Sequence, residues 1–229
     1  MSVSIQSVFI KYQIPDNVTK LAKAGAITAI VDTMKVNHEN DEVLQMAAAV
    51  LSNIASDKMV SGWMIEGGVL EVMMTVSTAF PDLIDLQKSC LGCLGNLCQN
   101  AENVYTMLDQ GCGKRILEIL ERLYFDDSIV TLSLSLIKIL THSPEVATQM
   151  VRDGAAEIIT QILKENVKKE SVIRICSQTL CKCIVNTESS EIAGTAGVID
   201  ALCDVAKEPY TCYNAPLMID VMKVCILSI

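Results

Sequence analysis

Aromatic residues are scarce in this sequence, with one tryptophan, three phenylalanines and five tyrosines among 229 residues, although 51% of the chain is hydrophobic. A core built from it must therefore consist of aliphatic and sulfur-containing side chains. There are only five prolines, and β-branched and aromatic residues rarely alternate, which argues against a β-sandwich. The composition favours closely packed helices, and we predict an all-α protein.

Long runs of one residue type are also missing. No stretch of eighteen uninterrupted apolar residues occurs, so we expect no membrane insertion. The formal net charge is −9 and no run of five basic residues exists, so we expect no nucleic-acid partner. The start, "MSVSIQSVFIKYQIPDN", lacks the basic segment and cleavage site of a signal peptide. We therefore expect a cytoplasmic protein, with the nucleus and the cytoskeleton as alternatives.

Motifs of catalysis are absent as well. The sequence has neither a G-x-x-x-x-G-K-[ST] phosphate loop nor a G-x-G-x-x-G motif. Its two histidines, His38 and His142, lie in predicted loops and support no Ser–His or Cys–His pairing. We predict that the chain is not an enzyme and holds no cofactor.

What the sequence does contain is a repeat marked by glycine. Five glycines are spaced 43 residues apart: Gly25, Gly68, Gly111, Gly154 and Gly197. A fixed period of this size is typical of solenoid proteins.

The residues around each glycine agree with one another. A short segment precedes it, as in "PEVATQMVRD", and an apolar stripe with helical spacing follows it, as in Ile116, Leu117 and Leu120. A polar loop then leads to a longer apolar segment. Glycine permits a sharp turn because it accepts positive φ. Each unit is therefore predicted to be a short helix, a glycine turn, a second helix, a loop and a longer third helix.

The phrases "AKAGAITAIV…MAAAVLSNIA" and "IEGGVLEVMM…CLGCLGNLC" resemble the armadillo repeat. The resemblance implies a right-handed α-solenoid superhelix of about five three-helix repeats. The units would span residues 14–56, 57–99, 100–142, 143–185 and 186–229. Residues 1–13 would be the third helix of a partial repeat, because Ile10 stands 43 residues before Asn53. Two-helix HEAT units are the nearest alternative, and the glycine turn and the short first helix count against them.

The ten cysteines fall among apolar helix positions, so we expect reduced, buried thiols. Cys90 and Cys93 form a C-x-x-C pair, but inside a predicted helix rather than in the loops that structural zinc prefers. We predict that Cys90, Cys93 and Cys176 are buried and free of metal. Trp63, on the first helix of its unit, is interpreted as a packing residue.

The far end of the chain, "VMKVCILSI", is an apolar helix, whereas solenoid ends normally carry a polar face. We expect further repeats or another chain to cover it. The side chains that would otherwise be partly uncovered are Val221, Met222, Cys225, Ile226 and Ile229.

The resemblance also implies a partner-binding groove lined by the third helices. The asparagine of "LSNIA" and the positions four and eight residues before it would face this groove, and Asn53 and Asn96 would bond the backbone of a bound peptide. With the nearby Lys138, the candidate groove residues are Gln45, Ala49, Asn53, Lys88, Gly92, Asn96, Thr131, Ser135, Lys138, Arg174, Gln178 and Lys182.

Importin-α-like arrays carry a tryptophan four residues before this asparagine, and here those positions hold Ala49, Gly92, Ser135 and Gln178. Cationic residues on the same row instead predict a weakly basic groove, similar to that of β-catenin-like arrays, which takes acidic peptides. We therefore predict a non-catalytic scaffold or adaptor that binds a protein or peptide segment, in the favoured case an acidic one. An assembly protein of a cytoskeletal or ciliary complex and a regulatory domain of a larger enzyme are the alternatives.

Overall fold

The computed structural model describes residues 15–208 and 214–227, which form helices joined by short connections, without a strand in these two ranges. The helices come in threes, as predicted. The first helices of the repeats are α2 (Pro15–Lys23), α5 (Lys58–Glu66), α8 (Ala101–Asp109), α11 (Pro144–Arg152) and α14 (Thr187–Thr195). The second helices are α3 (Ala26–Val36), α6 (Val69–Ala79), α9 (Cys112–Leu123), α12 (Ala155–Glu165) and α15 (Val198–Lys207). The third helices are α4 (Asp41–Ala55), α7 (Ile84–Leu97), α10 (Asp127–Leu140), α13 (Glu170–Cys183) and α17 (Ala215–Leu227).

The five repeat glycines stand where the sequence predicts them, each between a first and a second helix. All five have positive φ, from 78° at Gly68 and Gly197 to 100° at Gly154. This backbone conformation disfavours residues with a Cβ atom. The glycine at this phase is therefore a turn residue of the repeat unit.

Most first and third helices begin differently from the second helices. Asn40 caps α4 by accepting a hydrogen bond from Val43 N, and Asp57 caps α5 by accepting one from Met59 N. These side chains satisfy backbone donors at a helix start. Where a glycine opens a second helix, as Gly154 does for α12, it provides no side-chain cap. A polar residue thus marks most entries into a unit or a third helix, and glycine marks the tight turn.

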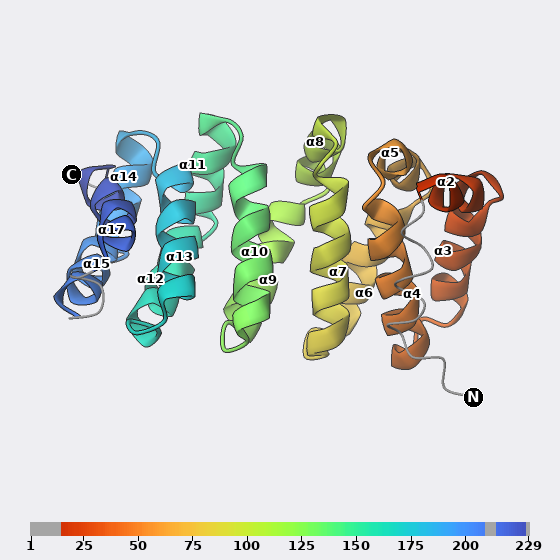
Figure 1. The fold of residues 1–229 in the computed structure, drawn as a ribbon, viewed down its shortest axis with the longest axis horizontal. Coiled ribbons are helices and arrows are strands. Elements are labelled where there is room, and N and C mark those ends of the chain that lie inside the picture. Colours follow the sequence, from red (N-terminus) through yellow and green to blue (C-terminus); the bar gives the residue numbers. More distant parts are fainter. Residues whose placement is uncertain (1–14, 209–213, 228–229) are drawn as a thin grey trace. The chain divides into compact units, whose positions relative to one another are not determined.

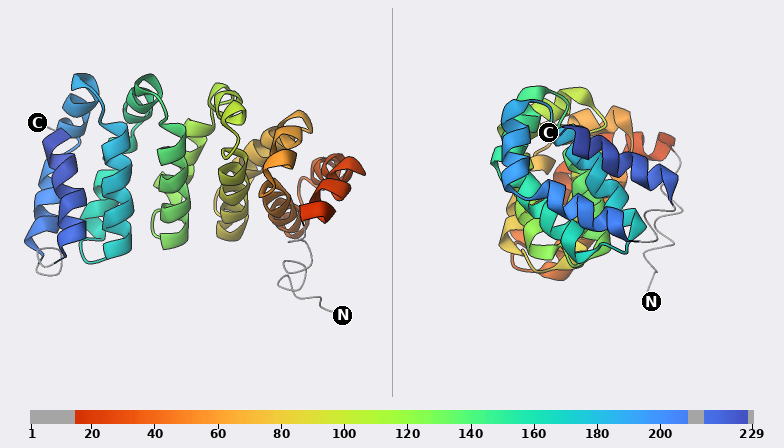
Figure 2. Two further views of the ribbon diagram at one scale, coloured as in Figure 1. Left: turned by 45° about the horizontal axis from the view of Figure 1, so that its top comes forward. Right: turned by 90° about the vertical axis from the view of Figure 1, so that its left-hand side faces the viewer.

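The helices form two compact units, Met1–Cys112 and Gly113–Ile229. Within each unit, corresponding helices of successive repeats lie side by side (Figures 1 and 2). In the first unit α4 packs on α7 and α5 on α8, and in the second unit α10 packs on α13 and α13 on α17. In each unit the helices bury aliphatic and sulfur-containing side chains. Leu94 and Cys93 in the first unit and Leu134 in the second are fully buried.

Two sequence-based interpretations are wrong. Trp63 is 37% exposed, because α5 buries the neighbouring stripe of Val60, Ser61 and Met64. Val221 is only 2% exposed, since it lies on the side of α17 that packs on α13 and α15.

The rest of the predicted uncovered end has a mixed outcome. Met222 is 55% exposed, as predicted. The side chains of Cys225 and Ile226, and Ile229 as a whole, lie outside the described part of the structure, as does the predicted partial repeat at residues 1–13.

In the described residues, no single helix is long and apolar enough to cross a membrane. Helices α5 and α6 satisfy the length and composition only as a pair, bent by 74° at the break between them. Their apolar residues Val60, Met64 and Val69 are fully buried inside the protein.

Candidate partner-binding faces on the third helices

All twelve predicted groove residues lie on third helices, and none is fully buried. We treat them as two faces, one in each compact unit. The first-unit face comprises Gln45, Ala49, Asn53, Lys88, Gly92 and Asn96 on α4 and α7. The second-unit face comprises Thr131, Ser135, Lys138, Arg174, Gln178 and Lys182 on α10 and α13.

The first-unit face has a floor of small residues. Ala49 and Gly92 are half-buried, and they leave no bulky side chain at the middle of either helix. A Cβ atom at Gly92 would lie 3.0 Å from Ser52 Oγ, tighter than ordinary packing. Gly92 therefore lets α7 approach α4 closely, and no side chain projects from α7 at this position.

The two asparagines of this face differ in their bonding. Asn96 Nδ2 donates to Ser52 O over 2.8 Å, and Asn96 Oδ1 accepts from Gln99 Nε2 over 3.3 Å. One N–H of the Asn96 amide thus joins α7 to α4, and the amide group has a second donor. Asn53 forms no matching bond to another helix within the described residues.

A hydrogen-bonded chain crosses the second-unit face. Lys138 Nζ donates to Gln178 Oε1 over 2.9 Å, and Gln178 Nε2 donates to Asp220 Oδ2 over 3.5 Å. These bonds connect α10 to α13 and α13 to α17. Three predicted or neighbouring face residues therefore act as one network across three successive third helices.

Arg174 joins the same network through two acids. Its Nη2 donates to Glu170 Oε1 over 2.6 Å, one helical turn away, and its Nη1 lies 3.5 Å from Asp220 Oδ2. Lys223 Nζ lies 3.7 Å from Asp220 Oδ1. The side chain of Asp220 is only 15% exposed and contacts Arg174, Gln178 and Lys223.

Sequence reasoning missed Glu170, Asp220 and Lys223. Glu170 stands four residues before Arg174 on one helix, a spacing that is visible in the sequence. Asp220 and Lys223 lie on α17, and the resemblance to the armadillo repeat gave no groove residues for that helix. With Glu170, Asp220 and Lys223 added to it, the second-unit face holds four cations, Lys138, Arg174, Lys182 and Lys223, and the two acids.

The cysteine predictions are confirmed as far as burial is concerned. Cys90, Cys93 and Cys176 are fully buried and are not in disulfides. Burial also raises the pKa values of the Cys98 and Cys112 thiols to about 12, as expected for an anion that would lose its water. These thiols are protonated packing groups at neutral pH.

Two cysteines depart from the pattern, because Cys203 is exposed and Cys181 is half-buried. Burial, and then the nearby carboxylate of Asp220, raise the pKa of Cys181. In the described ranges, no group of three or more His, Cys, Asp or Glu side chains is arranged to hold a metal. The absence of a metal stays a prediction.

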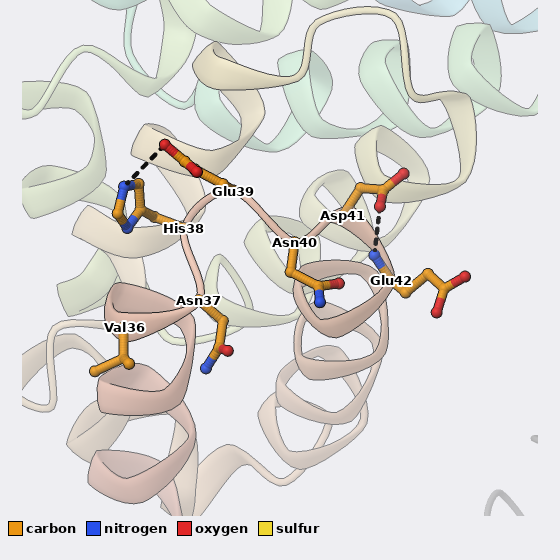
Figure 3. Close-up of a pocket in the computed structure, with 7 residues that line it drawn as sticks. All are labelled: Val36, Asn37, His38, Glu39, Asn40, Asp41 and Glu42. Carbon is orange, nitrogen blue, oxygen red and sulfur yellow. Dashed lines mark hydrogen bonds and ion pairs between the residues drawn. The ribbon is translucent and has the colours of Figure 1, made fainter.

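The connection from α3 to α4 forms an open hollow lined by residues 36–42 (Figure 3). His38 Nε2 lies 3.8 Å from Glu39 Oε1, and Glu42 N donates to Asp41 Oδ1 over 3.0 Å. The lining residues come from the end of α3, this connection and the first turn of α4, and His38 and Glu39 are well exposed. The hollow results from the bend of the chain between the two helices. The lining side chains do not converge on a shared point.

The fold and its repeats define an armadillo-repeat protein. The family model described as GAC ARM domain matches residues 15–227, and the chain belongs to that family. No curated protein matches the sequence.

Solved structures with this fold include designed armadillo repeat proteins. The designed protein YIII(Dq.V1)4CPAF, in complex with the peptide (KR)4, is 18% identical, with a TM-score of 0.76 over 98% of this chain and 93% of its own. The designed protein YIII(Dq)4CqI is 19% identical, with a TM-score of 0.75 over 100% of this chain and 96% of its own. An engineered protein is 16% identical, with a TM-score of 0.75 over 95% of this chain and 85% of its own. At these identities the likeness establishes the fold.

Proposed function

We propose that this chain is a non-catalytic interaction scaffold whose third helices bind an extended segment of a partner protein. The observation that carries the proposal is the accessibility of the predicted rows on α4, α7, α10 and α13, where none of the twelve residues is fully buried. Small residues at Ala49, Gly92 and Ser135 leave room for a polypeptide backbone close to the helices. Polar and charged groups beside them supply hydrogen bonds for its peptide groups, which would otherwise lose their water partners on binding.

The charge of the second-unit face favours an acidic partner segment. Four cations stand there with two acids, Glu170 and Asp220. A designed neighbour is solved with the basic peptide (KR)4. We propose the opposite preference for this chain, because a basic segment would add to the excess positive charge of this face.

Lys138 and Lys182 are the cations best placed to meet the partner's carboxylates. Arg174 already bonds Glu170 and Asp220, so its charge is compensated within the protein. Lys138 bonds the neutral amide of Gln178, and Lys182 is exposed one turn beyond it on α13. The pair Lys138 and Lys182 is therefore the sharpest place to test recognition.

The test is a fluorescence-anisotropy titration with two labelled peptides of equal length, one alternating Glu and Ser and the other alternating Lys and Ser. Wild type should bind the Glu–Ser peptide in preference. The double variant Lys138→Glu/Lys182→Glu should weaken that binding by about tenfold or more, because like charges then face each other. The loss should shrink at high salt, since exposed charges are screened.

The matched control is Lys114→Glu/Lys164→Glu, which makes the same change in net charge on the second helices α9 and α12, where both lysines are exposed. It should bind the Glu–Ser peptide nearly as wild type does. Equal weakening in both double variants would show general charge attraction and would remove the second-unit face as the site.

An assembly role is the second candidate, because α17 exposes two large apolar side chains. Ile219 is 53% exposed and Met222 is 55% exposed. Such residues are typical of surfaces that another chain covers. Self-association of the protein without peptide in the same titrations would favour this role. The cytoplasmic location stays a prediction.

A further inference from the structure

Helix α17 begins later in its repeat than the other described third helices do. Helices α4, α7, α10 and α13 begin 43 residues apart, at Asp41, Ile84, Asp127 and Glu170. Helix α17 begins at Ala215, which is 45 residues after the start of α13. The first and second helices of the same repeat, α14 and α15, keep the spacing of 43 residues. Residues of α17 are therefore compared with those of other third helices by their position counted from the helix start.

Burial in α17 agrees with this count. Val221 is 2% exposed and stands at the seventh position, as the fully buried Cys176 does in α13. Val224 stands at the tenth position and has no exposed surface, and its counterpart Thr179 is also fully buried. A count by 43 residues would instead match Val221 with Gln178, which is only half-buried. The later start thus changes which side of α17 is buried.

The fifth and ninth positions of the third helices are two of the predicted groove rows. In α17 these positions hold Ile219, which is 53% exposed, and Lys223, whose side chain is 60% exposed. Between them, the Asp220 carboxylate lies 3.5 Å from both Arg174 Nη1 and Gln178 Nε2, which are at the fifth and ninth positions of α13. Helix α17 lies beside α13, as α13 lies beside α10 (Figure 1). The rows of the second-unit face therefore continue onto α17.

Met222 differs from Ile219, although both are apolar and exposed on α17. Met222 is 55% exposed and stands at the eighth position, which Leu134 holds in α10. The backbone oxygen of Leu134 accepts a hydrogen bond from Thr179 Oγ1 on α13 over 3.4 Å, so the eighth position of α10 faces the following third helix. Ile219 therefore belongs to the second-unit face, whereas Met222 lies on the side of α17 away from α13.

We propose that Ile219 and Lys223 extend the second-unit face, and that this face binds a partner segment carrying an apolar side chain close to a carboxylate. The proposal rests on the proposed function and adds the kind of segment that is bound. Lys223 Nζ lies 3.7 Å from Asp220 Oδ1, a long contact that leaves the ammonium group accessible to a partner's carboxylate. Ile219 offers apolar surface, whose removal from water favours binding. Lys138 and the 43% exposed Ile139 form a second pair of this kind on α10.

The spacing of the two α17 residues defines the sequence pattern of the partner. Ile219 and Lys223 are one helical turn apart, about 6 Å along the helix. In an extended segment, side chains two residues apart point to the same side and are separated by about 6.6 Å. An apolar residue and an acid with one residue between them therefore match the pair. The test peptide repeats Glu-Ser-Leu-Ser, and the control peptide, of equal length and charge, repeats Glu-Ser-Ser-Ser.

Fluorescence anisotropy with the two labelled peptides measures the contribution of Ile219. Wild type should bind the leucine-containing peptide about fivefold or more tightly than the control peptide, because leucine buries apolar surface. Ile219→Ser should remove this preference without changing the affinity for the control peptide. Met222→Ser is the matched variant, because Met222 is exposed to nearly the same extent, and it should retain the preference. No preference in wild type, or equal effects of the two variants, would overturn the proposal.

The contribution of Lys223 is tested by reversing its charge. Lys223→Glu should weaken the binding of both peptides by about tenfold or more, because like charges then face each other. Lys207→Glu on α15 is the control, since Lys207 is also exposed and also pairs with an aspartate three residues earlier. It should bind both peptides nearly as wild type does, and equal weakening by both variants would contradict the role of Lys223. Circular dichroism checks that the variants remain helical.

These measurements separate the proposal from the function on which it rests. If Lys138→Glu/Lys182→Glu weakens binding but the α17 variants do not, the scaffold function stands and the extension to α17 is wrong. If wild type binds no acidic peptide, both are wrong. A dimer in sedimentation that both Ile219→Ser and Met222→Ser dissociate would identify a second copy as the occupant and would also overturn the proposal. A monomer whose α10, α13 and α17 amides exchange more slowly when the leucine-containing peptide is bound would support it.

Discussion

Gly154 and Gly194 lie in successive repeats, and their backbone conformations differ. Gly154 has a φ of 100°, and a Cβ atom there would meet nothing within 4 Å. This position therefore favours glycine because of its positive φ, and not because a side chain would lack space. Gly194 lies inside α14 with equally open surroundings and without a positive φ.

We predict opposite signs for the same substitution at these two glycines. Gly154→Ala should lower the free energy of unfolding by about 1–2 kcal/mol, the cost of a left-handed backbone for a residue with a Cβ. Gly194→Ala should raise it by up to about 1 kcal/mol, because alanine loses less entropy in a helix. Urea unfolding of both variants measures the difference. A stabilising Gly154→Ala would contradict the turn assignment.

For single residues, the sequence predicted the glycine turns better than it predicted which side of a helix is buried. A glycine at fixed phase has one physical meaning, and the positive φ values follow from it. The side of α5 that faces the core could not be predicted, because Met59, Val60, Trp63 and Met64 are apolar on more than one side. The same ambiguity in α17 led to the wrong expectation for Val221.

Among the helices, the third ones carry both the packing and the candidate site. Their existence and order follow from apolar spacing and the repeat period. The network on the second-unit face does not, because it depends on the register of α17 against α13, which places Asp220 within 3.5 Å of Arg174 and Gln178. No sequence pattern specifies that register.

Helix α7 provides the test of third-helix packing. Leu94 is fully buried on it, whereas Leu83, at its start, is 37% exposed. Leu94→Ala should cost about 2–5 kcal/mol through the cavity it leaves, and Leu83→Ala should cost much less. Because repeats contact mainly their neighbours, faster amide exchange in Leu94→Ala should be strongest in α4–α8 and fade toward α17.

Native-state hydrogen exchange followed by mass spectrometry measures this pattern segment by segment. A similar cost for both leucine variants would contradict the assignment of Leu94 to the core. Uniform acceleration over all helices would instead show that the chain unfolds as a single cooperative whole.

For the molecule as a whole, the sequence was sufficient to predict the all-α class, the repeat and the armadillo resemblance, which the family match confirms. The partner was not predictable in the same way. Repeat positions fix which residues lie on the third-helix faces, but recognition depends on how their charges pair, as the acids beside Arg174 show. The row of cations predicted from the sequence therefore carries less uncompensated positive charge than expected, because acids pair with Arg174.

Buried thiols occur in both units, and they contribute to the response of the protein to alkaline pH. Burial raises the pKa values of five fully or almost fully buried cysteines above the ordinary value of 9.0. They are Cys93, Cys98, Cys112, Cys176 and Cys183. Below pH 9 these thiols are protonated in the folded and the unfolded chain, so they add no pH dependence there.

Above pH 9 the unfolded chain loses these protons while the folded protein retains them, to about pH 12 for Cys98, Cys112 and Cys183. The unfolded state then binds fewer protons, so stability must fall as pH rises, by up to about 1.4 kcal/mol per pH unit for each thiol. Cys176→Ala removes one of them at a position where the repeat elsewhere holds Ala47, and its stability should fall less steeply between pH 9 and 11. Cys203→Ala is the control, because that thiol is exposed in the folded protein. Urea unfolding under reducing conditions across this range measures the slopes, and parallel curves for wild type and Cys176→Ala would show that the Cys176 thiol ionises as readily in the folded protein as in the unfolded chain.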